Sequence, residues 1–431
     1  MAPRRRRLSD AVRVEAARRR LFARADVRAA AGVARSRGLP ARLVGGAVRD
    51  ALLEAAGEPG RPVRDLDLSA PAGVAAAFAA ALAERLGTRA VAVGPPGKRI
   101  LRLPLDGREV DVFETAGSPD EDLLRRDFTV NAMAFDLGTG DFEAPAGALA
   151  DLRARRLALP RAGVLLEDPL RVLRAARFLA ELPGFRVASR ARPEFEAAGR
   201  FLRTAAEERR LVEMNKLLAA PPKDRDRALR FLEDVGALGS LLRGTAARTR
   251  RRGLSFVSRL DSRDPRVARA LLLLPLGATR AEEILRTWKT TRQERQLAKK
   301  LFSLARAVGA RRPSRAPTRR EIVEVIRAVS PFFEESALLL SAFTDARSRR
   351  LASAVRSLAR DRTRLARLLR PKRPMEVLEV ASLPGISSGP ELGRALAALD
   401  LAVAAGEVRS RPGALRLLAR LGRGSPRRAT R

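Results

Sequence analysis

The spacing of hydrophobic and polar positions changes once along this chain, near Leu165. Before that point, short apolar runs alternate with polar residues at every second position, which is typical of half-buried strands. Strands are predicted at residues 39–46, 61–70, 89–94, 99–105 and 108–114 and near 141–142. Helices are predicted at residues 9–37, 47–56, 72–87 and 125–136. A turn at Asp106 and Gly107 joins the last two long strands as a hairpin.

After Leu165 the strand pattern disappears, and helical spacing continues with breaks rich in Pro and Gly. The length of 431 residues allows several domains. The predicted fold class is an α/β N-terminal head, built on a small mixed sheet with helices, followed by an all-α remainder. The last ten residues, GRGSPRRATR, have the composition of a disordered tail.

The charge of the chain indicates a partner class. Lys and Arg number 86 against 49 Asp and Glu, so the net charge is +37. A field of this sign attracts polyanions, with nucleic acid ahead of an anionic membrane surface. Arginines that decorate solvated helix faces are the alternative explanation. Because no apolar run reaches the ~18 residues of a membrane span and the basic N-terminus lacks a secretory apolar segment, we expect no membrane partner and a cytoplasmic location.

The residue types that the chain lacks restrict its chemistry. It contains no Cys and no His. This excludes disulfides, thiolate nucleophiles, Cys/His zinc sites and any reaction with a histidine base. Metal chemistry must therefore use carboxylates, and carboxylates without imidazole suit Mg²⁺.

Two carboxylates stand side by side in the strand predicted at residues 61–70. Asp65 and Asp67 point to the same face because strand side chains alternate. Like charges this close oppose each other unless a cation lies between them, and nucleotidyl transfer uses such cations. We therefore predict two Mg²⁺ ligands; a harmless solvent-facing strand edge is the alternative. The strand REVDVFE offers Glu109 and Asp111 on one face as a third carboxylate.

Two adjacent glycines mark the point where a predicted strand ends and a helix begins. Gly45 and Gly46 lack Cβ atoms, so the backbone there can approach a phosphate, and the N–H groups at the helix start favour anions. Such a pair is more often a plain turn. The glycines therefore indicate a phosphate site only in combination with the neighbouring carboxylates.

Four segments together carry a family resemblance. They are GGAVRD at 45–50, DLD at 65–67, RRDFTVNAMAFD at 125–136 and EDPLRVLRAARF at 167–178. Their order, spacing and residues resemble class II tRNA nucleotidyltransferases and bacterial poly(A) polymerases, in the polymerase-beta superfamily, over roughly half the chain. That family adds nucleotides from CTP and ATP, or from one of them, to RNA 3′ ends without a nucleic-acid template.

The resemblance implies a domain plan and roles for single residues. The plan is a basic arm at 1–26, a nucleotidyltransferase head at 27–160, a base-recognising neck at 161–222, and an RNA-binding body and tail at 223–330 and 331–431. Asp65, Asp67 and Glu109 would be the catalytic carboxylates that hold Mg²⁺, with Asp111 in reserve. The nucleotide would be bound by Gly45, Gly46, Arg49, Arg125, Arg126, Asp127, Asn131, Asp168, Arg171, Arg174 and Arg177. The helix at 207–218 would brace the pocket with Arg209 or Arg210.

A pair of residues on one helix face accounts for the choice of base in this resemblance. Asp168 accepts hydrogen bonds and Arg171 donates them, and residues three apart on a helix share a face. Cytosine and adenine both present an amino donor beside a ring-nitrogen acceptor, whereas uracil and guanine present the reverse order. One such pair can therefore admit C and A and refuse U and G. The alternative is a helix start in which Asp168 is the N-cap and Pro169 the first helical residue.

The predicted reaction is CCA addition to the acceptor end of tRNA, with CTP and ATP as substrates; the residues indicate no protein partner. Addition of A or CC alone, a poly(A) polymerase and a non-catalytic RNA-binding protein are the alternatives. The short acidic segment ETAGSPDED stands where the family carries a longer loop that helps the change from C to A, and the chain lacks the His–Val pair of the polymerase branch. Arginine clusters at 248–252 and 347–350 are candidates for phosphate contacts.

Overall fold

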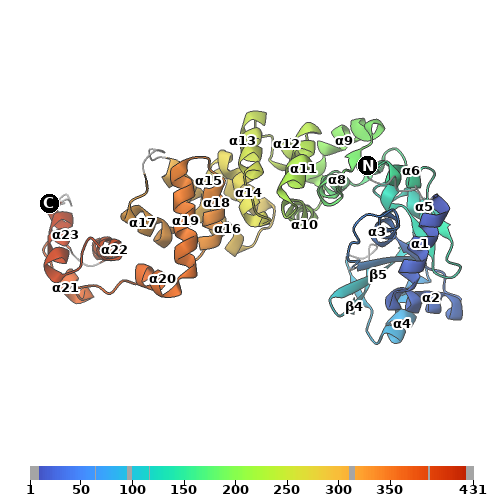
Figure 1. Cartoon of the computed structure of the whole chain (residues 1–431), viewed down its shortest axis with the longest axis horizontal. Helices are drawn as coiled ribbons and strands as arrows, with labels where there is room; N and C mark the ends of the chain where they lie inside the picture. The colour runs from blue at the N-terminus through green and yellow to red at the C-terminus, as the bar shows by residue number, and fades with distance from the viewer. Residues whose placement is uncertain are drawn as a thin grey trace, which may run out of the picture. The chain divides into compact units, whose positions relative to one another are not determined.

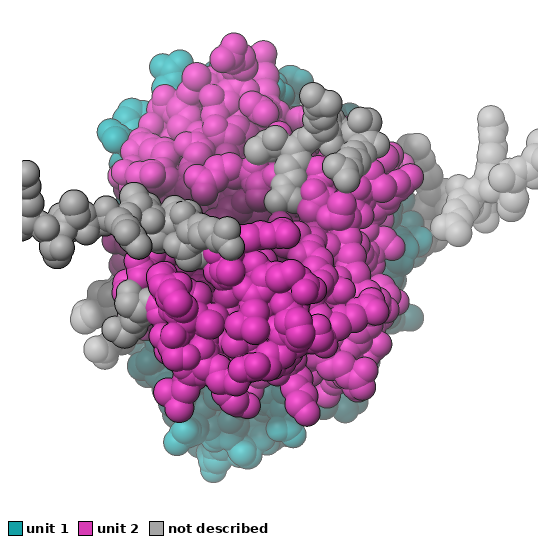
Figure 2. Space-filling model, turned by 90° about the vertical axis from the view of Figure 1, so that its left-hand side faces the viewer, with its two compact units in different colours: residues 1–205, 231–241 teal, residues 206–230, 242–431 magenta. Residues whose placement is uncertain are grey.

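The structure is a computed structural model that describes residues 9–63, 65–94, 100–115, 117–309, 316–386 and 389–423. The chain divides into two compact units, which Figure 2 colours separately. Unit 1 comprises residues 1–205 and 231–241, and unit 2 comprises residues 206–230 and 242–431. Most of the predicted disordered tail, residues 424–431, lies outside the described residues.

Unit 1 contains every strand of the described chain and the helices around them (Figure 1). Its strands are β1 (Arg42–Val44), β2 (Asp65–Pro71), β3 (Val91–Val93), β4 (Ile100–Leu105), β5 (Arg108–Thr115), β6 (Ala134–Asp136), β7 (Phe142–Glu143), β8 (Arg156–Leu157) and β9 (Arg186–Val187). Its α-helices are α1 (Asp10–Phe22), α2 (Ala25–Arg37), α3 (Gly46–Ala55), α4 (Ala75–Leu86), α5 (Pro119–Leu124), α6 (Ala148–Arg153), α7 (Val164–Glu167), α8 (Leu170–Glu181), α9 (Arg192–Gly199) and α12 (Ala237–Leu241). Short 3₁₀ turns are η1 (Thr129–Asn131), η2 (Ser189–Ala191) and η3 (Leu202–Thr204).

A seven-stranded mixed sheet forms the centre of unit 1. Its strand order is β3-β4-β5-β2-β1-β6-β7. β2 lies parallel to β5, whereas β1 is antiparallel to both β2 and β6. β4 and β5 form the predicted hairpin around Asp106 and Gly107. The predicted small mixed sheet of the head is therefore confirmed.

The two faces of β2 and β5 differ in polarity, as the alternation predicted. Leu66, Leu68, Val110 and Val112 are buried, and α4 contacts both strands. α4 contributes Phe78, Ala79 and Leu82 to the buried core. Burial of large apolar side chains of this kind stabilises a fold by about 1.5–3 kcal/mol each. The opposite face of the two strands is left with the charged side chains, which makes it available for chemistry.

The helix predicted over residues 125–136 is wrong. α5 ends before this segment, residues Thr129–Asn131 form a 3₁₀ turn, and Ala134–Asp136 is a strand. The strand forms because β6 pairs with β1, placing Ala134 opposite Val44, and this tertiary pairing outweighs the helical spacing. A two-stranded sheet of β8 and β9 also lies beyond the point where the strand pattern was expected to end.

Unit 2 is helical throughout its described residues (Figure 1). Its α-helices are α10 (Glu207–Leu218), α13 (Ala247–Ser258), α14 (Pro265–Leu273), α15 (Ala278–Thr287), α16 (Arg292–Gly309), α17 (Arg319–Val329), α18 (Phe333–Ser341), α19 (Ala346–Arg360), α20 (Arg362–Leu369), α21 (Val377–Ala381), α22 (Pro390–Ala405) and α23 (Arg411–Arg423). The chain also forms η4 (Leu274–Leu276) here and α11 (Pro222–Asp234) at the division between the units. No helix in the described part of the chain is long and apolar enough to cross a membrane.

Candidate active site

The carboxylate face of the sheet gathers the four acidic side chains that the alternation predicted. In the parallel pairing of β2 with β5, Asp65 lies opposite Glu109 and Asp67 lies opposite Asp111. Side chains of directly opposed residues point to the same face. The structure therefore places both predicted ligands of β2 beside both candidates for the third carboxylate.

A single arginine on β4 holds the two carboxylates of β5. Arg102 lies opposite Asp111 in the hairpin and binds it through two hydrogen bonds, Nε to Oδ1 at 2.9 Å and Nη2 to Oδ2 at 2.8 Å. Its Nη1 also lies 2.8 Å from Oε2 of Glu109. The hydrogen bonds to Asp111, partly opposed by burial, raise the pKa of Arg102, so the guanidinium stays charged.

Asp67 is the carboxylate nearest to the two glycines. A Cβ built on Gly45 would lie 3.4 Å from Oδ2 of Asp67 and from Nη1 of Arg126, and Gly45 has a φ of +79° that disfavours other residues. Burial raises the pKa of Asp67, Arg126 acts against this rise, and Asp111 adds to it. A cation at this position would therefore favour the ionised form of Asp67.

The carboxylates of this face determine whether Mg²⁺ can be held here. Among the described residues, no group of three or more carboxylates is arranged to hold one metal ion. The third carboxylate differs from the first two because Glu109 and Asp111 are both engaged by Arg102. Mg²⁺ commonly uses one or two carboxylates together with substrate phosphates, so Asp65 and Asp67 fit this ion by themselves. The buried Nε of Arg126 has no hydrogen-bond partner in the described chain, which fits an anion beside them.

A hydrogen-bonded chain of four residues connects three of the sequence motifs. Nη1 of Arg49 donates to Oδ1 of Asn131 at 2.6 Å, and Nδ2 of Asn131 donates to Oδ1 of Asp127 at 3.0 Å. Nε of Arg174 donates to Oδ2 of Asp127 at 2.9 Å. Burial favours a higher pKa for Asp127, but Arg174, Asn131 and the Phe128 N–H outweigh it, and the pKa is lowered. Asp127 and Asn131 are therefore in contact, but they do not share the helix that was predicted for them.

An aromatic ring supports the same arginines. The guanidinium carbons of Arg49, Arg174 and Arg177 lie 5.4, 5.6 and 4.5 Å from the centre of the Phe178 ring. Phe178 is buried and also makes an edge contact with Phe128 at 5.8 Å. Cations within about 6 Å of a ring are attracted to its face. The ring therefore helps to keep three like charges together in one place.

The predicted base-recognising pair lies at the start of α8. Oδ1 of Asp168 accepts a hydrogen bond from the Leu170 N–H at 3.2 Å, but the N-cap of α8 is Pro169 rather than Asp168. Arg171 donates through Nη1 to the Val164 carbonyl at 2.9 Å and through Nη2 to the Arg125 carbonyl at 2.6 Å. Burial lowers the pKa of Arg171, and the charges of Asp127 and Asp168 oppose this effect. These contacts fix the direction of the guanidinium.

Of the remaining predicted residues, Gly46 lies in unit 1 and the two arginine candidates of α10 lie in unit 2. Gly46 begins α3, and a Cβ on it would lie 3.6 Å from Nη2 of Arg49. Of the two candidates on α10, Arg210 is buried and Arg209 is exposed. Arg210 belongs to unit 2, so its relation to the site stays a prediction.

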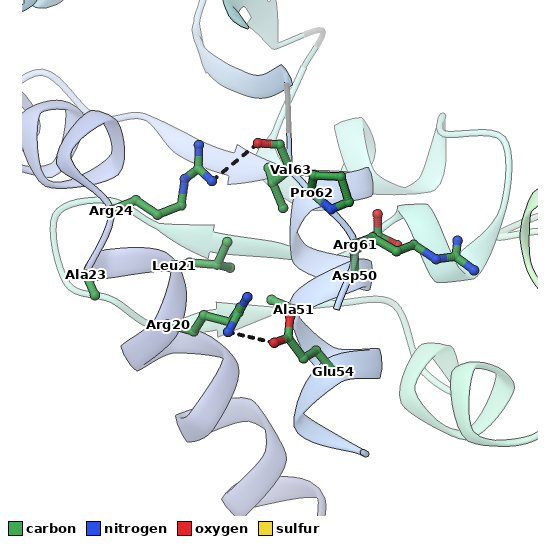
Figure 3. Close-up of a pocket in the computed structure, with 10 residues that line it drawn as sticks. All are labelled: Arg20, Leu21, Ala23, Arg24, Asp50, Ala51, Glu54, Arg61, Pro62 and Val63. Carbon is green, nitrogen blue, oxygen red and sulfur yellow. Dashed lines mark hydrogen bonds and ion pairs between the residues drawn. The ribbon is translucent and has the colours of Figure 1, made fainter. Parts of the chain in front are cut away.

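A cavity of about 550 Å³ lies beside α1 and α3 (Figure 3). Arg20 pairs with Glu54 across it at 2.6 Å, and Arg24 donates to the Val63 carbonyl at 3.3 Å. Asp50 lines the cavity and also accepts a hydrogen bond from Nε of Arg49 at 2.9 Å. α1 therefore packs against α3 beside this cavity.

Two residues of the site were missed in the sequence. Arg102 could have been found, since it stands four residues before Asp106 and its partner Asp111 stands four residues after Gly107. Phe178 follows the last arginine of the EDPLRVLRAARF segment, but an apolar residue on a helix gives no separate signal there.

The predicted arginine clusters of unit 2 are only partly exposed. Arg347 is buried and binds Oε2 of Glu321 at 2.9 Å, so it is part of the helical core. Arg248, Arg251 and Arg252 are exposed on α13. A groove of about 570 Å³ on α19 and its end is lined by Ser353, Arg356, Ser357, Arg360 and Asp361.

The chain is similar to known proteins both in sequence and in fold. Residues 41–158 match the poly A polymerase head domain. The chain is 36% identical over 209 residues to a CC-adding tRNA nucleotidyltransferase of Shouchella clausii, covering 47% of this chain and 50% of that protein. It is 34% identical over 267 residues to a CCA-adding enzyme of Geobacillus stearothermophilus, covering 58% of this chain and 63% of that protein.

A solved structure extends the likeness to nearly the whole chain. The Thermotoga maritima CCA-adding enzyme complexed with tRNA aligns with a TM-score of 0.64 at 20% identity. The alignment covers 92% of this chain and 94% of that one. At this identity the likeness concerns the fold. It confirms the predicted architecture of an α/β head followed by helices, whereas the two sequence matches span 50% and 63% of the length of those relatives.

Proposed function

We propose that the protein adds C and A to the 3′ end of tRNA; this proposal starts from the match of residues 41–158 to the poly A polymerase head domain and from the similarity to tRNA nucleotidyltransferases. The 3′ hydroxyl attacks the α-phosphorus of CTP or ATP, the bond from that phosphorus to the bridging oxygen breaks, and pyrophosphate leaves. The alternatives are an enzyme that adds A or CC alone and a poly(A) polymerase.

The observation that supports this proposal is the hydrogen-bonded chain from Arg49 through Asn131 and Asp127 to Arg174. It connects the glycine turn, the RRDFTVNA segment and the α8 segment within unit 1. Charged hydrogen bonds between buried groups are strong and directional, so they hold each motif in register with the others. Catalysis of phosphoryl transfer depends mainly on such positioning and on electrostatic stabilisation.

The triphosphate is proposed to lie against Gly45 and the start of α3. The first N–H groups of a helix have no partner within it, and the helix dipole favours an anion at this end. Arg126 supplies a guanidinium whose Nε is buried without a partner in the described residues. Mg²⁺ held by Asp65 and Asp67 would supply activation of the attacking hydroxyl and stabilisation of the leaving pyrophosphate.

The base is proposed to be read by Asp168 and Arg171. The carbonyl groups of Val164 and Arg125 orient Arg171, which lowers the entropy lost when it binds a base edge. A base with the reversed donor and acceptor order would leave buried polar groups unpaired. In the assay below, Arg171→Ala is expected to incorporate U and G alongside C and A.

The tRNA is proposed to bind through arginines of unit 2 rather than through aromatic stacking. Trp and Phe make up the aromatic residues, which are 4% of the chain. The groove on α19 combines two arginines, Arg356 and Arg360, with the hydroxyl groups of Ser353 and Ser357. Such donors bind phosphate oxygens irrespective of base sequence, as recognition of a folded RNA by its shape requires.

The test uses the full chain with tRNA ending at the discriminator base, after one C, or after CC. Each nucleoside triphosphate is supplied singly and in mixtures with Mg²⁺, and product lengths are read on a sequencing gel. Completion of CCA from the bare end is expected. Addition only up to CC, or only to the CC end, would replace the proposal by a CC-adding or an A-adding enzyme. Long A tails on unstructured RNA would replace it by a poly(A) polymerase.

A further inference from the structure

A buried carboxylate outside the predicted site connects three segments of unit 1. Asp26 lies in the first turn of α2, and its side chain is 4% exposed. An acidic residue stabilises a helix at this position, and Oδ1 of Asp26 accepts a hydrogen bond from the Val27 N–H at 2.9 Å. This single contact does not offset the free-energy cost of burying a carboxylate, so the other partners of Asp26 must do so.

Two guanidinium groups bind Asp26 from different parts of the chain. Arg24, between α1 and α2, donates through Nε to Oδ1 at 3.0 Å and through Nη2 to Oδ2 at 2.7 Å. Arg108, the first residue of β5, donates through Nη1 to Oδ2 at 3.2 Å. Both guanidinium groups are permanently charged, so the buried carboxylate lies between two cations.

The third donor group of Arg24 reaches the segment that precedes β2. Its Nη1 donates to the Val63 carbonyl at 3.3 Å (Figure 3). Val63 stands two residues before Asp65. Because the guanidinium is planar and two of its nitrogens bind Asp26, the direction of the third nitrogen is fixed by that carboxylate. Asp26 therefore determines how Arg24 holds this backbone carbonyl.

The start of β2 is flanked by one strand only. β1 pairs with residues 67–69 of β2, so Asp65 lies beyond the pairing with β1. β5 flanks Asp65 on the other side, with Asp65 opposite Glu109, the residue that follows Arg108. Asp26 is therefore connected to both strands at the point where their pairing begins.

We propose that Asp26 is a positioning residue that holds the starts of β2 and β5 in place through Arg24 and Arg108, and thereby fixes Asp65 on the carboxylate face. This inference rests on the proposed function, in which Asp65 binds Mg²⁺. It extends that function by giving the junction of α1 and α2, which carries none of the predicted site residues, a role in the reaction. Arg108 alternates with Glu109 along β5, so the cluster lies on the opposite face and acts on Asp65 through the backbone.

The variant Asp26→Asn tests the role in the reaction. It keeps an oxygen for the Val27 N–H and removes the charge that holds both guanidinium groups. We expect kcat to fall about 30-fold, because a small displacement of a reacting group has a large effect on rate. The KM for CTP is expected to change by about twofold or less, since the residues proposed to bind the nucleotide keep their contacts. The Mg²⁺ concentration for half-maximal rate is expected to rise about fivefold.

A second measurement follows the backbone itself, by hydrogen–deuterium exchange of the full chain without nucleotide or metal. In Asp26→Asn, we expect exchange within residues 61–70 to become about tenfold faster, with exchange in β6 unchanged. An increase of similar size throughout unit 1 would show a general loss of stability and would overturn the positioning role.

The variant Arg24→Met tests the route from Asp26 to β2. Arg24→Met alone is expected to cause most of the loss in kcat, and adding Asp26→Asn is expected to lower kcat by about twofold or less, because both changes break one connection. Fully additive losses would overturn the inference. The matched control is Arg20→Met, which lines the same cavity but pairs with Glu54 at 2.6 Å; its kcat and its exchange in residues 61–70 should equal those of the wild type.

The variant Asp65→Asn separates failure of this inference from failure of the proposed function. If Asp65→Asn abolishes incorporation and Asp26→Asn has the kcat of the wild type, the positioning role is overturned and the proposed reaction stands. If Asp65→Asn incorporates nucleotide as the wild type does, the carboxylate site is overturned, and the inference on Asp26 with it.

Discussion

Arg49 in unit 1 and Arg225 in unit 2 are both buried, and they bind different kinds of group. In unit 1, the 7% exposed Arg49 binds side chains, the carboxylate of Asp50 and the amide of Asn131. In unit 2, the fully buried Arg225 binds the backbone carbonyl groups of Leu218, Val257, Leu260 and Ser262. A buried charge therefore does not by itself mark an active site.

The partners of Arg225 explain its structural character. Val257 lies in the last turn of α13, and Leu260 and Ser262 follow that helix, so the carbonyl groups of Leu260 and Ser262 lie beyond the regular hydrogen bonds of α13. Arg225 supplies the missing donors and connects α11 to the end of α13. Arg49, by contrast, connects polar side chains that stand in motifs. The comparison implies that a variant at the carboxylate face of unit 1 should affect activity and that a variant at Arg225 should affect stability.

The largest effect is expected at the carboxylate face. Asp67→Asn keeps the shape of the side chain but removes the charge that would hold a divalent cation. We expect nucleotide incorporation to fall about 1000-fold or more, with tRNA affinity and the free energy of unfolding nearly unchanged. Primer extension on a gel, filter binding and urea unfolding measure the three quantities. A large loss in the free energy of unfolding of Asp67→Asn would contradict this prediction, because Asp67 would then contribute to stability as Arg225 does.

The next effect is expected at Arg225. Arg225→Met leaves several carbonyl groups of unit 2 buried without a donor, and we expect a loss of about 3 kcal/mol in the free energy of unfolding. Arg230→Met is the control, because the side chain of Arg230 is 68% exposed and pairs with Asp226 on its own helix; its loss should cost about 0.5 kcal/mol or less. Urea unfolding followed by circular dichroism compares the two. Similar values for both variants would contradict the assigned role.

A smaller effect with a defined pH dependence is expected at Arg174. The pKa of Asp127 is lowered in the folded protein, so its contribution to stability is present above about pH 4, the ordinary value, and is lost as the pH falls through the lower folded pKa. In Arg174→Met, burial dominates and the folded pKa of Asp127 rises. We expect about 2 kcal/mol less stability than wild type at pH 7, with the difference shrinking toward pH 3.

The measurement is urea unfolding across that pH range. Arg177→Met is the matched control, because it removes an arginine from the same helix that pairs with Glu181 at 3.5 Å. A difference between Arg174→Met and wild type that stays constant with pH would show that Asp127 does not carry the effect.

The smallest effect is expected at Phe178. Phe178→Leu removes the ring over which three guanidinium groups gather, while it keeps an apolar side chain in the core. We expect the KM for CTP to rise about tenfold with a smaller change in kcat. Phe231→Leu is the control, since Phe231 contacts Phe195 at 5.3 Å and none of these arginines. A fall in kcat without a change in KM would contradict a role in nucleotide binding.

Much of this arrangement was accessible from the sequence. Strict alternation in the strands predicted that Asp65 and Asp67 share a face, and the two-residue turn fixed the hairpin that carries Glu109 and Asp111. These features depend on neighbours in the chain. The register of β2 against β5 depends on residues far apart in the chain. The alternation in both strands predicted only which face of each strand is polar.

The errors have a common physical origin in long-range contacts. The segment that contains Asn131 has helical spacing. Ala134 and its neighbours nevertheless form a strand, because they pair with the edge of β1. The burial of Arg347 and its pair with Glu321 depend on the packing of α17 against α19. Local spacing contains no information on either contact, and tertiary interactions decided both.

The parallel pairing of β2 with β5 also affects how the chain folds during synthesis. A ribosome that has completed β2 has produced both Asp65 and Asp67, but the strand that flanks them follows only after α4, β3 and β4. β1 waits longer still, because its second neighbour is β6. During synthesis β2 can pair with β1 at once, but its other edge has no partner strand until β5 has been made. The nascent chain is consequently most prone to wrong associations while the segment between Pro71 and Arg108 is being made.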